Sequence, residues 1–387
     1  MACGLGMVSC RKMVSIDEPI NSITTPQMFG TDAQAATAMA GVYTTMTNSP
    51  LSFSNGYTTL LAGMSSDELY YYGTGDAHIL SFTPNQLVFS NSYTSTLWTS
   101  AYKTIYNANA VIEGIAGSAS GVLTDSTRQR LTGEAKFVRA FCYFYLTNLF
   151  GDVPLALTVD FNKTQYMART PVVNVYGQII KDLQDAQSML SASYPTPAGK
   201  ERIVPNKWVA TALLARVYLF TGDYANAATQ ASAVIANSSV YNLESDPNNV
   251  FLTGSKEAIW QLKQSVTDPT IRNCTMEGYT VLPSVLATGV ARYCLTTSLL
   301  NAFEASDKRR NAWVNSTTNN GTGVTYFPFK YKTGIYNAVA SAAATEYYMV
   351  LRLAEMYLIR AEAEVNGATG GATAAISDLN VLRSRAG

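Results

Sequence analysis

The sequence contains little charge and a single histidine, and both shortages exclude classes of function. Only 14% of its 387 residues are charged, and 27 acidic side chains balance 27 basic ones. A neutral chain has no excess of positive charge with which to bind nucleic-acid phosphates or an anionic membrane surface. We therefore expect no nucleic-acid partner.

Catalysis has few candidate residues in this chain. His78 is the single histidine, and no serine or cysteine motif for nucleophilic chemistry accompanies it. No Walker-type phosphate loop occurs. A glycoside hydrolase needs two carboxylates about 5 to 10 Å apart, and Asp67 and Asp76 offer such a pair, although nothing marks them as catalytic. We expect no enzyme activity, no catalytic residue and no cofactor, and we keep hydrolysis as the less favoured alternative.

The five cysteines do not form a metal-binding pattern. Because no CxxC pair or Cys/His cluster occurs, no metal site is predicted. Cys142 lies in an apolar stretch and is interpreted as an inert core thiol. Cys274 and Cys294 could form a disulfide in an oxidising compartment, which the sequence does not decide.

No run of 18 apolar residues is present, so no transmembrane helix is predicted and attachment to a membrane would require an anchor. The opening residues MACGLGMVSC end in Met7-Val8-Ser9-Cys10, which resembles the end of a bacterial lipoprotein signal. We predict that residues 1–10 are a truncated signal with Cys10 as the lipid acceptor, in preference to Cys3. An unmodified, disordered N-terminus is the alternative.

Tyrosine, in contrast, is abundant, with 24 residues, and the chain is also rich in Ser, Thr and Asn. With so few charges, the surface is predicted to be neutral, polar and aromatic. Sugars present hydroxyls for hydrogen bonding and C–H faces that stack on aromatic rings. The composition therefore favours a carbohydrate ligand.

Apolar residues recur with helical spacing in several segments. From Ala135 to Leu149 they fall three or four residues apart, and phenylalanines add a second stripe, so this helix is predicted to be buried on nearly all sides. The predicted helices cover residues 32–46, 93–115, 126–150, 174–190, 206–221, 224–237, 349–365 and 372–385.

Three of these helices share a six-residue pattern: large, small, any, apolar, Tyr, Leu, at 141–146, 214–219 and 353–358. The small residue lets a partner helix approach closely, while Tyr and Leu fill the gap between neighbouring hairpins, as in tetratricopeptide repeats of about 34 residues. The pattern predicts a mainly α fold: a tetratricopeptide-like solenoid of about four helical hairpins, with loop-rich insertions that carry a few short strands.

Two segments, 47–92 and 238–345, do not fit the solenoid. The second is rich in Asn, Thr, Gly and Tyr, with strands predicted at 258–264 and 326–331. Long irregular insertions on a rigid scaffold are where binding surfaces usually lie. We therefore predict one domain over 11–387, with a helical scaffold at about 30–237 and 346–387, an insertion at about 238–345, and the function in the insertions.

The chain resembles the SusD/RagB family along nearly its whole length. The most characteristic segment is GEAKFVRAFCYFYLTNLFGDVPL at 133–155, an Arg-bearing aromatic helix that ends in Phe-Gly-Asp-Val-Pro. Four further segments match in the same order: 19–29, 98–112, 207–224 and 351–387. Five matching segments in one order are a far more specific signal than any single short motif.

The resemblance implies an outer-membrane lipoprotein, facing the extracellular side, that captures oligosaccharides or polysaccharides. It implies delivery of the glycan to a TonB-dependent, SusC-like transporter on which the helical side docks. It also implies a missing C-terminal portion, because relatives usually continue past residue 387. A scaffold or lid for the transporter that binds no sugar is the alternative, and would carry its apolar patch on the hairpins and not aromatic side chains in the insertions.

The first candidate glycan site is a tyrosine run in the first insertion. Successive side chains of an extended segment point to opposite faces, so Tyr70 and Tyr72 are predicted to share one face as a stacking platform beside carboxylates. At least one of the three tyrosines is expected to be core. The candidates are Asp67, Tyr70, Tyr71, Tyr72 and Asp76.

The second candidate site lies in the large insertion. Arg and Asn donate paired hydrogen bonds to vicinal hydroxyls, while Tyr supplies a flat face. The candidates are Arg272, Asn273, Tyr279, Arg292 and Tyr293. The tryptophans are interpreted as structural: Trp98 and Trp208 in helices, Trp260 in a strand, and Trp313 in packing.

Overall fold

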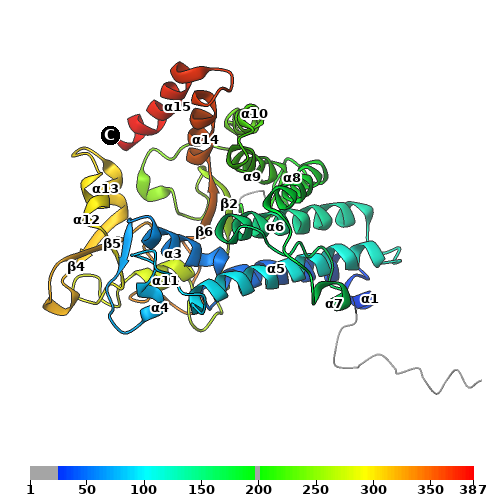
Figure 1. Cartoon of the computed structure of the whole chain (residues 1–387), viewed down its shortest axis with the longest axis horizontal. Coiled ribbons are helices and arrows are strands. Elements are labelled where there is room, and N and C mark those ends of the chain that lie inside the picture. The colour runs from blue at the N-terminus through cyan, green and yellow to red at the C-terminus, as the bar shows by residue number, and fades with distance from the viewer. Residues whose placement is uncertain (1–24, 197–200) are drawn as a thin grey trace, which may run out of the picture.

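The computed structural model describes residues 25–196 and 201–387. Within this part of the chain, eight long helices stack side by side, most of the short helices lie with β4 and β5 on the left, and α1 and α7 lie at the right-hand end (Figure 1). The long helices associate in four pairs: α2 (Asp32–Thr47) with α5 (Ser92–Gly117), α6 (Asp125–Phe150) with α8 (Val172–Met189), α9 (Lys207–Phe220) with α10 (Tyr224–Ile235), and α14 (Leu353–Val365) with α15 (Gly371–Ala386).

Consecutive pairs pack through α5 on α6, α8 on α9 and α10 on α14, so the pairs form one continuous solenoid. The predicted mainly α fold of about four hairpins is confirmed. Side chains at the residue before each helix fix where many of them begin, because they accept hydrogen bonds from free N–H groups of the first turn. These N-cap residues are Thr31, Asn91, Thr124, Asn206 and Asp223.

The repeated six-residue pattern packs the hairpins together. Its small residues, Cys142, Ala215 and Ala354, are buried on α6, α9 and α14. At the third position, Arg216 donates to Glu355 Oε2 at 2.6 Å and to the hydroxyl of Tyr145 at 3.2 Å. The position that the pattern leaves open therefore supplies polar links between successive hairpins.

One predicted helix begins later than expected. Residues 349–352 were predicted as the first turn of the helix that ends at Val365, but Tyr348–Arg352 is strand β6 and α14 starts at Leu353. The prediction was wrong because Met349, Leu351 and Arg352 pair with β2 (Ala258–Leu262) in an antiparallel ladder. Pairing with a buried strand overrides the helical spacing of these apolar residues.

Three antiparallel two-stranded ladders connect distant parts of the insertions. Besides β2–β6, β1 (Leu69–Tyr71) pairs with β3 (Tyr293–Leu295), and β4 (Val314–Thr317) pairs with β5 (Thr325–Pro328). The strand predicted at 258–264 is confirmed as β2, and the strand predicted at 326–331 overlaps β5, which ends at Pro328. The β1–β3 ladder joins the first insertion to the second, which a single sequence did not predict.

The remaining helices are short and occupy the insertions and loops. Most of them surround the three ladders on the left of Figure 1. They are α1 (Thr25–Met28), the π-helix η2 (Phe53–Tyr57), α3 (Thr58–Ser65), α4 (Ala77–Leu80), α7 (Phe161–Thr164), η4 (Pro247–Asn249), α11 (Met276–Val281), α12 (Thr297–Asn301), α13 (Lys308–Trp313) and η5 (Asn319–Gly321).

The core of the protein spans both regions. Trp260 on β2 is fully buried, and its ring meets those of Phe137 and Phe141 on α6 edge to face, with centroids 4.9 and 5.3 Å apart. Cys142, Cys274 and Cys294 are all buried free thiols, so the disulfide considered for the last two does not form. Cys3 and Cys10, and with them the predicted lipid anchor, lie outside the described residues.

Candidate functional site

The β1–β3 ladder brings together residues from both predicted glycan sites. Tyr71 lies opposite Tyr293, and the N–H of Tyr72 donates to the carbonyl of Arg292 at 2.7 Å. The tyrosine run and the Arg292-Tyr293 dipeptide, more than two hundred residues apart in the chain, therefore form one surface.

On one face of the ladder, the tyrosines cluster ring against ring. The rings of Tyr71 and Tyr293 meet edge to face with centroids 5.4 Å apart, and those of Tyr57 and Tyr93 do so at 5.6 Å. Burial raises the pKa of Tyr293, and the hydroxyls of the other three tyrosines raise it further. All four phenols are thus neighbours, and Tyr293 stays protonated at neutral pH. We call these four residues the tyrosine cluster.

Asp76 lies in the loop that follows β1 and contacts the tyrosine cluster. The hydroxyl of Tyr93 donates to Asp76 Oδ2 at 2.5 Å, and Asp76 Oδ1 accepts the N–H groups of His78 and Ile79 at the start of α4. The hydrogen bond from Tyr93 holds the pKa of Asp76 below its usual value. Asp76 is therefore an ionised residue that positions Tyr93, and both its oxygens already have partners.

The other face of the ladder carries Tyr70, Tyr72, Arg292 and Cys294, because directly paired residues point to the same side. Tyr70 is half-buried beside Cys294, and burial raises its pKa to about 12. Tyr72 is 36% exposed, with its hydroxyl 2.8 Å from Oγ1 of Thr322. Arg292 is exposed beside Tyr72. The exposed part of this face is thus an aromatic ring, a guanidinium and a hydroxyl. We call Tyr72, Arg292 and Thr322 the tyrosine platform.

Asp67 is not part of this surface. It precedes β1 at the end opposite Tyr72, on the order of 15 Å away along a strand of about 3.3 Å per residue. It takes a left-handed conformation with φ of 63°, and its carbonyl accepts the hydroxyl of Thr296 at 2.6 Å. Asp67 and Asp76 lie beyond opposite ends of β1, so the structure does not bring them together as a carboxylate pair.

Three further predicted residues have partners elsewhere. Arg272 is exposed and donates to the carbonyl of Ala338 at 3.0 Å. Asn273 is buried, and its side-chain oxygen accepts the N–H of Val339 at 2.8 Å. Tyr279 is half-buried on α11 against the core. The partners of Arg272 and Asn273 lie at 338–339, not on β1.

The sequence did not single out Tyr57, Tyr93 or Thr322. Tyr93 lies just after the N-cap Asn91, and its place in a predicted helix concealed its role. Tyr57 belongs to a π-helix, and Thr322 follows η5, neither of which has a sequence pattern that marks it as part of a binding surface. In the structure, Tyr57 and Tyr93 belong to the tyrosine cluster on one face of the ladder, and Thr322 contacts Tyr72 on the other face.

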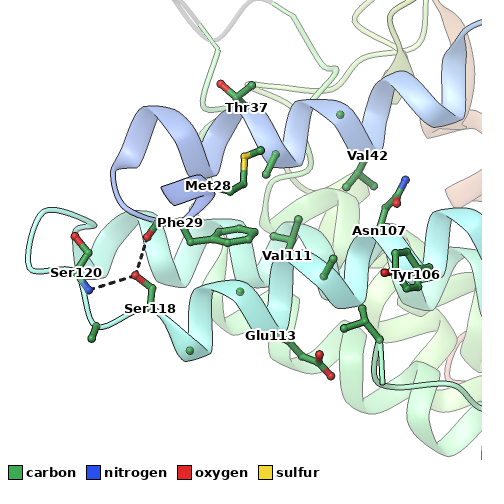
Figure 2. A pocket seen from close by; sticks show the side chains of 17 residues that line it. Met28, Phe29, Thr37, Val42, Tyr106, Asn107, Val111, Glu113, Ser118 and Ser120 are labelled. Atoms are coloured by element: carbon green, nitrogen blue, oxygen red, sulfur yellow. Dashed lines mark hydrogen bonds between the residues drawn. The ribbon is translucent and has the colours of Figure 1, made fainter. Parts of the chain in front are cut away.

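A separate groove of about 1010 Å³ lies between α2 and α5, far along the solenoid from the tyrosine platform (Figure 2). Phe29 points into it, and a Cβ on Gly114 would lie 2.1 Å from the ring of Phe29. The hydroxyl of Ser118 donates to the carbonyl of Phe29 at 2.7 Å. Glu113 is the one charged residue of the lining, so this groove is an apolar helix–helix surface.

Within residues 25–196 and 201–387, no helix is both long and apolar enough to cross a bilayer, and no three His, Cys, Asp or Glu side chains are grouped to hold a metal ion.

Comparison with protein families gives two matches. Residues 21–219 match a family described as SusD-like, starch-binding and associating with the outer membrane, and residues 311–387 match the SusD family. The first match covers just over half of the chain.

Individual relatives agree with the family matches. The chain is 26% identical to SusD-like protein P2 of Formosa agariphila, over 99% of this chain and 79% of that protein. The structure is similar to that of a SusD superfamily protein from Bacteroides thetaiotaomicron, with a TM-score of 0.76 and 22% identity over 92% and 80% of the two chains. It is also similar to a SusD-like carbohydrate binding protein from Bacteroides fragilis, with a TM-score of 0.76 and 18% identity over 93% and 79%.

Proposed function

The chain belongs to the SusD family, and from this premise we propose that it is a cell-surface protein that binds glycans at the tyrosine platform without cleaving them. The observation that carries the proposal is the β1–β3 pairing, which places Tyr72 and Arg292 side by side on an exposed face. The proposed ligand is an oligosaccharide or a polysaccharide.

The chemistry of the tyrosine platform suits sugar rings. The aromatic face of Tyr72 offers a surface for the C–H groups of a sugar, and stacking of this kind contributes about 0.5–1.5 kcal/mol beyond the area it buries. Arg292 supplies several N–H donors for vicinal hydroxyls, and Thr322 supplies a hydroxyl that both donates and accepts. Each contact is weak alone, so affinity depends on a chain long enough to engage several of them.

Binding without cleavage is proposed because the described site lacks a free pair of carboxylates. Asp76 uses both oxygens in hydrogen bonds to Tyr93, His78 and Ile79. Asp67 lies beyond the other end of β1. A glycosidase requires one carboxyl to donate a proton and the other to activate water or attack the sugar, and neither Asp76 nor Asp67 is placed for that.

Delivery of the glycan to a TonB-dependent, SusC-like transporter in the outer membrane, with a lipid anchor at Cys10, is the finer part of the proposal. Exposed apolar side chains at one end of the hairpins favour a protein partner there: Leu149 at the end of α6, Val173 at the start of α8 and Phe220 at the end of α9. This surface would dock on the transporter while the tyrosine platform holds the sugar.

A scaffold that docks on the transporter and binds no sugar is the second candidate. The apolar hairpin ends favour it, since they would serve docking whether or not a glycan is bound. The exposed Tyr72 in the insertion favours glycan capture, so the two candidates differ in whether the tyrosine platform has a ligand.

The test is affinity gel electrophoresis of the purified protein against a panel of plant, algal, starch and host polysaccharides, followed by calorimetry with the polysaccharide that retards it. We expect retardation by at least one polysaccharide, no release of products, and loss of retardation in Tyr72→Ala. Tyr106→Ala is the matched control, because Tyr106 is an exposed tyrosine on α5 that lines the groove of Figure 2. A folded protein that no polysaccharide retards would favour the scaffold.

A further inference from the structure

A second cavity, separate from the tyrosine platform, lies in the insertion region at the other end of the β1–β3 ladder. Its volume is about 330 Å³, at the lower end of the range for small-molecule sites. Leu69 and Leu295, which pair with each other in the ladder, form part of its wall. Other apolar walls come from α3, α13, β4 and β5: Leu60, Trp313, Val314 and Pro328.

The cavity contains a buried carboxyl that the glycan proposal does not use. Glu277, in the first turn of α11, lines the cavity and is 7% exposed. Among the described residues, no Lys, Arg or His nitrogen forms an ion pair with it. A buried carboxylate without an ion-pair partner is unusual, because desolvation of the charge costs several kcal/mol.

The groups around Glu277 do not neutralise it. Burial raises the pKa of Glu277 to about 7, while Lys330 and the hydroxyl of Thr59 lower it by smaller amounts. Burial also raises the pKa of Tyr331 and of Tyr348, so both phenols stay neutral. Lys330 lowers the pKa of Glu277 by its charge, but it lies too far from Glu277 to form an ion pair with it.

The charges at the mouth of the cavity favour a cation. Arg309 donates to Asp307 at 2.6 Å, so this guanidinium is already compensated. The ammonium of Lys330 lies 5.7 Å from the ring centroid of Trp313. Glu68 lines the mouth as a second carboxylate. Arg352 also lies 5.9 Å from the Trp313 ring centroid, but it pairs with Glu257. Burial lowers the pKa of Lys330. With Glu277 ionised, the carboxylates without an ion-pair partner among the described residues, Glu277 and Glu68, outnumber the one such cation, Lys330.

We propose that this cavity binds a small organic amine, with its ammonium group against the carboxylate of Glu277 and its apolar body against Leu60, Leu69 and Trp313. Hydrogen bonds between ions are about twice as strong as those between neutral groups. The inference does not depend on the glycan proposal, since the cavity and the tyrosine platform share no residue.

The test uses three probes of the same shape and different charge: benzylamine, benzyl alcohol and benzoate, titrated by calorimetry into the intact protein at pH 7. We expect benzylamine to bind about ten-fold more tightly than benzyl alcohol, since one charged hydrogen bond corresponds to about that ratio, and benzoate to bind weakest. Equal binding of all three, tightest binding of benzoate, or no binding of benzylamine would overturn the proposal.

Two further measurements assign the binding to Glu277. Glu277→Gln should lose about ten-fold in affinity for benzylamine, while Glu113→Gln, in the distant groove, should lose none. In the unaltered protein, an ammonium that stabilises the carboxylate displaces its proton, so titrations in phosphate and Tris buffers should report release of about half a proton at pH 7. Unchanged affinity in Glu277→Gln, or no proton release, would contradict the assignment even if benzylamine binds.

Discussion

The helical hairpins and the insertions differ in how their charged side chains are paired. On the hairpins, charged side chains lie in pairs: Arg139 with Asp182, Arg216 with Glu355, and Arg360 with Asp378. In the insertions, Glu277 and Arg292 have no ion-pair partner among the described residues. Paired groups hold a scaffold in one arrangement, whereas groups without partners remain free to bind a ligand.

Three residues limit this contrast. Asp307 in the large insertion is buried and pairs with Arg309. Glu257 in the large insertion is fully buried, yet it pairs with Arg352, just before α14, and with Arg385 on α15, so it fastens the insertion to the last hairpin. Glu364 on α14 has one buried oxygen without a partner, and burial raises its pKa. The contrast between the two regions is therefore a tendency of their charged side chains and has these exceptions.

The largest effect is expected from breaking a buried pair on the scaffold. Arg139 makes two hydrogen bonds of 2.8 Å to Asp182, and both side chains are buried. Arg139→Ala leaves the carboxylate of Asp182 without its partner and should lower the free energy of unfolding by about 3–5 kcal/mol, measured by urea denaturation. The matched control is Lys163→Ala, in an exposed pair with Asp160, for which a change below about 1 kcal/mol is expected. If both variants lost a similar free energy of unfolding, the buried pair would stabilise the fold no more than the exposed pair does.

The next effect concerns Glu277 and pH. Its pKa of about 7 in the folded protein, against the usual 4.5, means that the folded state keeps a proton that the unfolded state has already released. The stability from this group is fully present below pH 4.5 and is lost as pH rises through 7, by up to about 3 kcal/mol. Glu277→Gln should therefore match the unaltered protein near pH 4.5 and exceed it at pH 8.

Urea denaturation of both proteins at several pH values measures this difference. The gap in unfolding free energy should open between pH 4.5 and 7 and stay constant above it. A gap of the same size at every pH would mean that Glu277 is ionised in the folded protein, which would place it with the paired charges of the scaffold.

A smaller effect is expected at the tyrosine platform, on binding and not on stability. Arg292→Ala should weaken glycan binding about ten-fold, since hydrogen bonds to a charged donor contribute about 1.5–3 kcal/mol, with the thermal midpoint unchanged. Arg310→Ala serves as the control, because Arg310 lies over the ring of Tyr326 at 4.9 Å and belongs to neither proposed site. Calorimetry with the retarding polysaccharide measures both. Equal losses in the two variants would argue against a role specific to Arg292.

The smallest effect is expected from Tyr72→Phe, which keeps the ring and removes only the hydroxyl that contacts Thr322. If stacking dominates, affinity should fall by less than the ten-fold expected for the lost guanidinium, because a neutral hydrogen bond contributes about 0.5–1.5 kcal/mol. Calorimetry on Tyr72→Phe and Tyr72→Ala separates the contribution of the ring to affinity from that of the hydroxyl. Equal losses in the two variants would mean that the hydroxyl, and not the ring, carries the contact.

The scaffold was largely predictable because its signals are local. The spacing of apolar residues over 93–115, 126–150 and 224–237 matches α5, α6 and α10 closely, and the resemblance to the SusD/RagB family is confirmed by the family matches. The error at 349–352 arose where a distant strand, β2, captured apolar residues whose spacing also suits a helix.

The candidate site was less predictable because it depends on one long-range pairing. The sequence indicated Tyr72 and Arg292 separately by residue type, but their meeting follows from β1 pairing with β3. Glu277 was not predicted as a site residue, because nothing in the sequence shows that this glutamate is buried in a cavity. Trp313 was interpreted as packing and does pack on Phe251, yet it also lines that cavity.

The most direct test of the central claim is amide hydrogen exchange, read by mass spectrometry, with and without the retarding polysaccharide. Our account predicts protection in the two segments that form the β1–β3 ladder, around Tyr72 and Arg292, and unchanged exchange in α9 and α10. Protection confined to the helical hairpins, with none at the ladder, would contradict it.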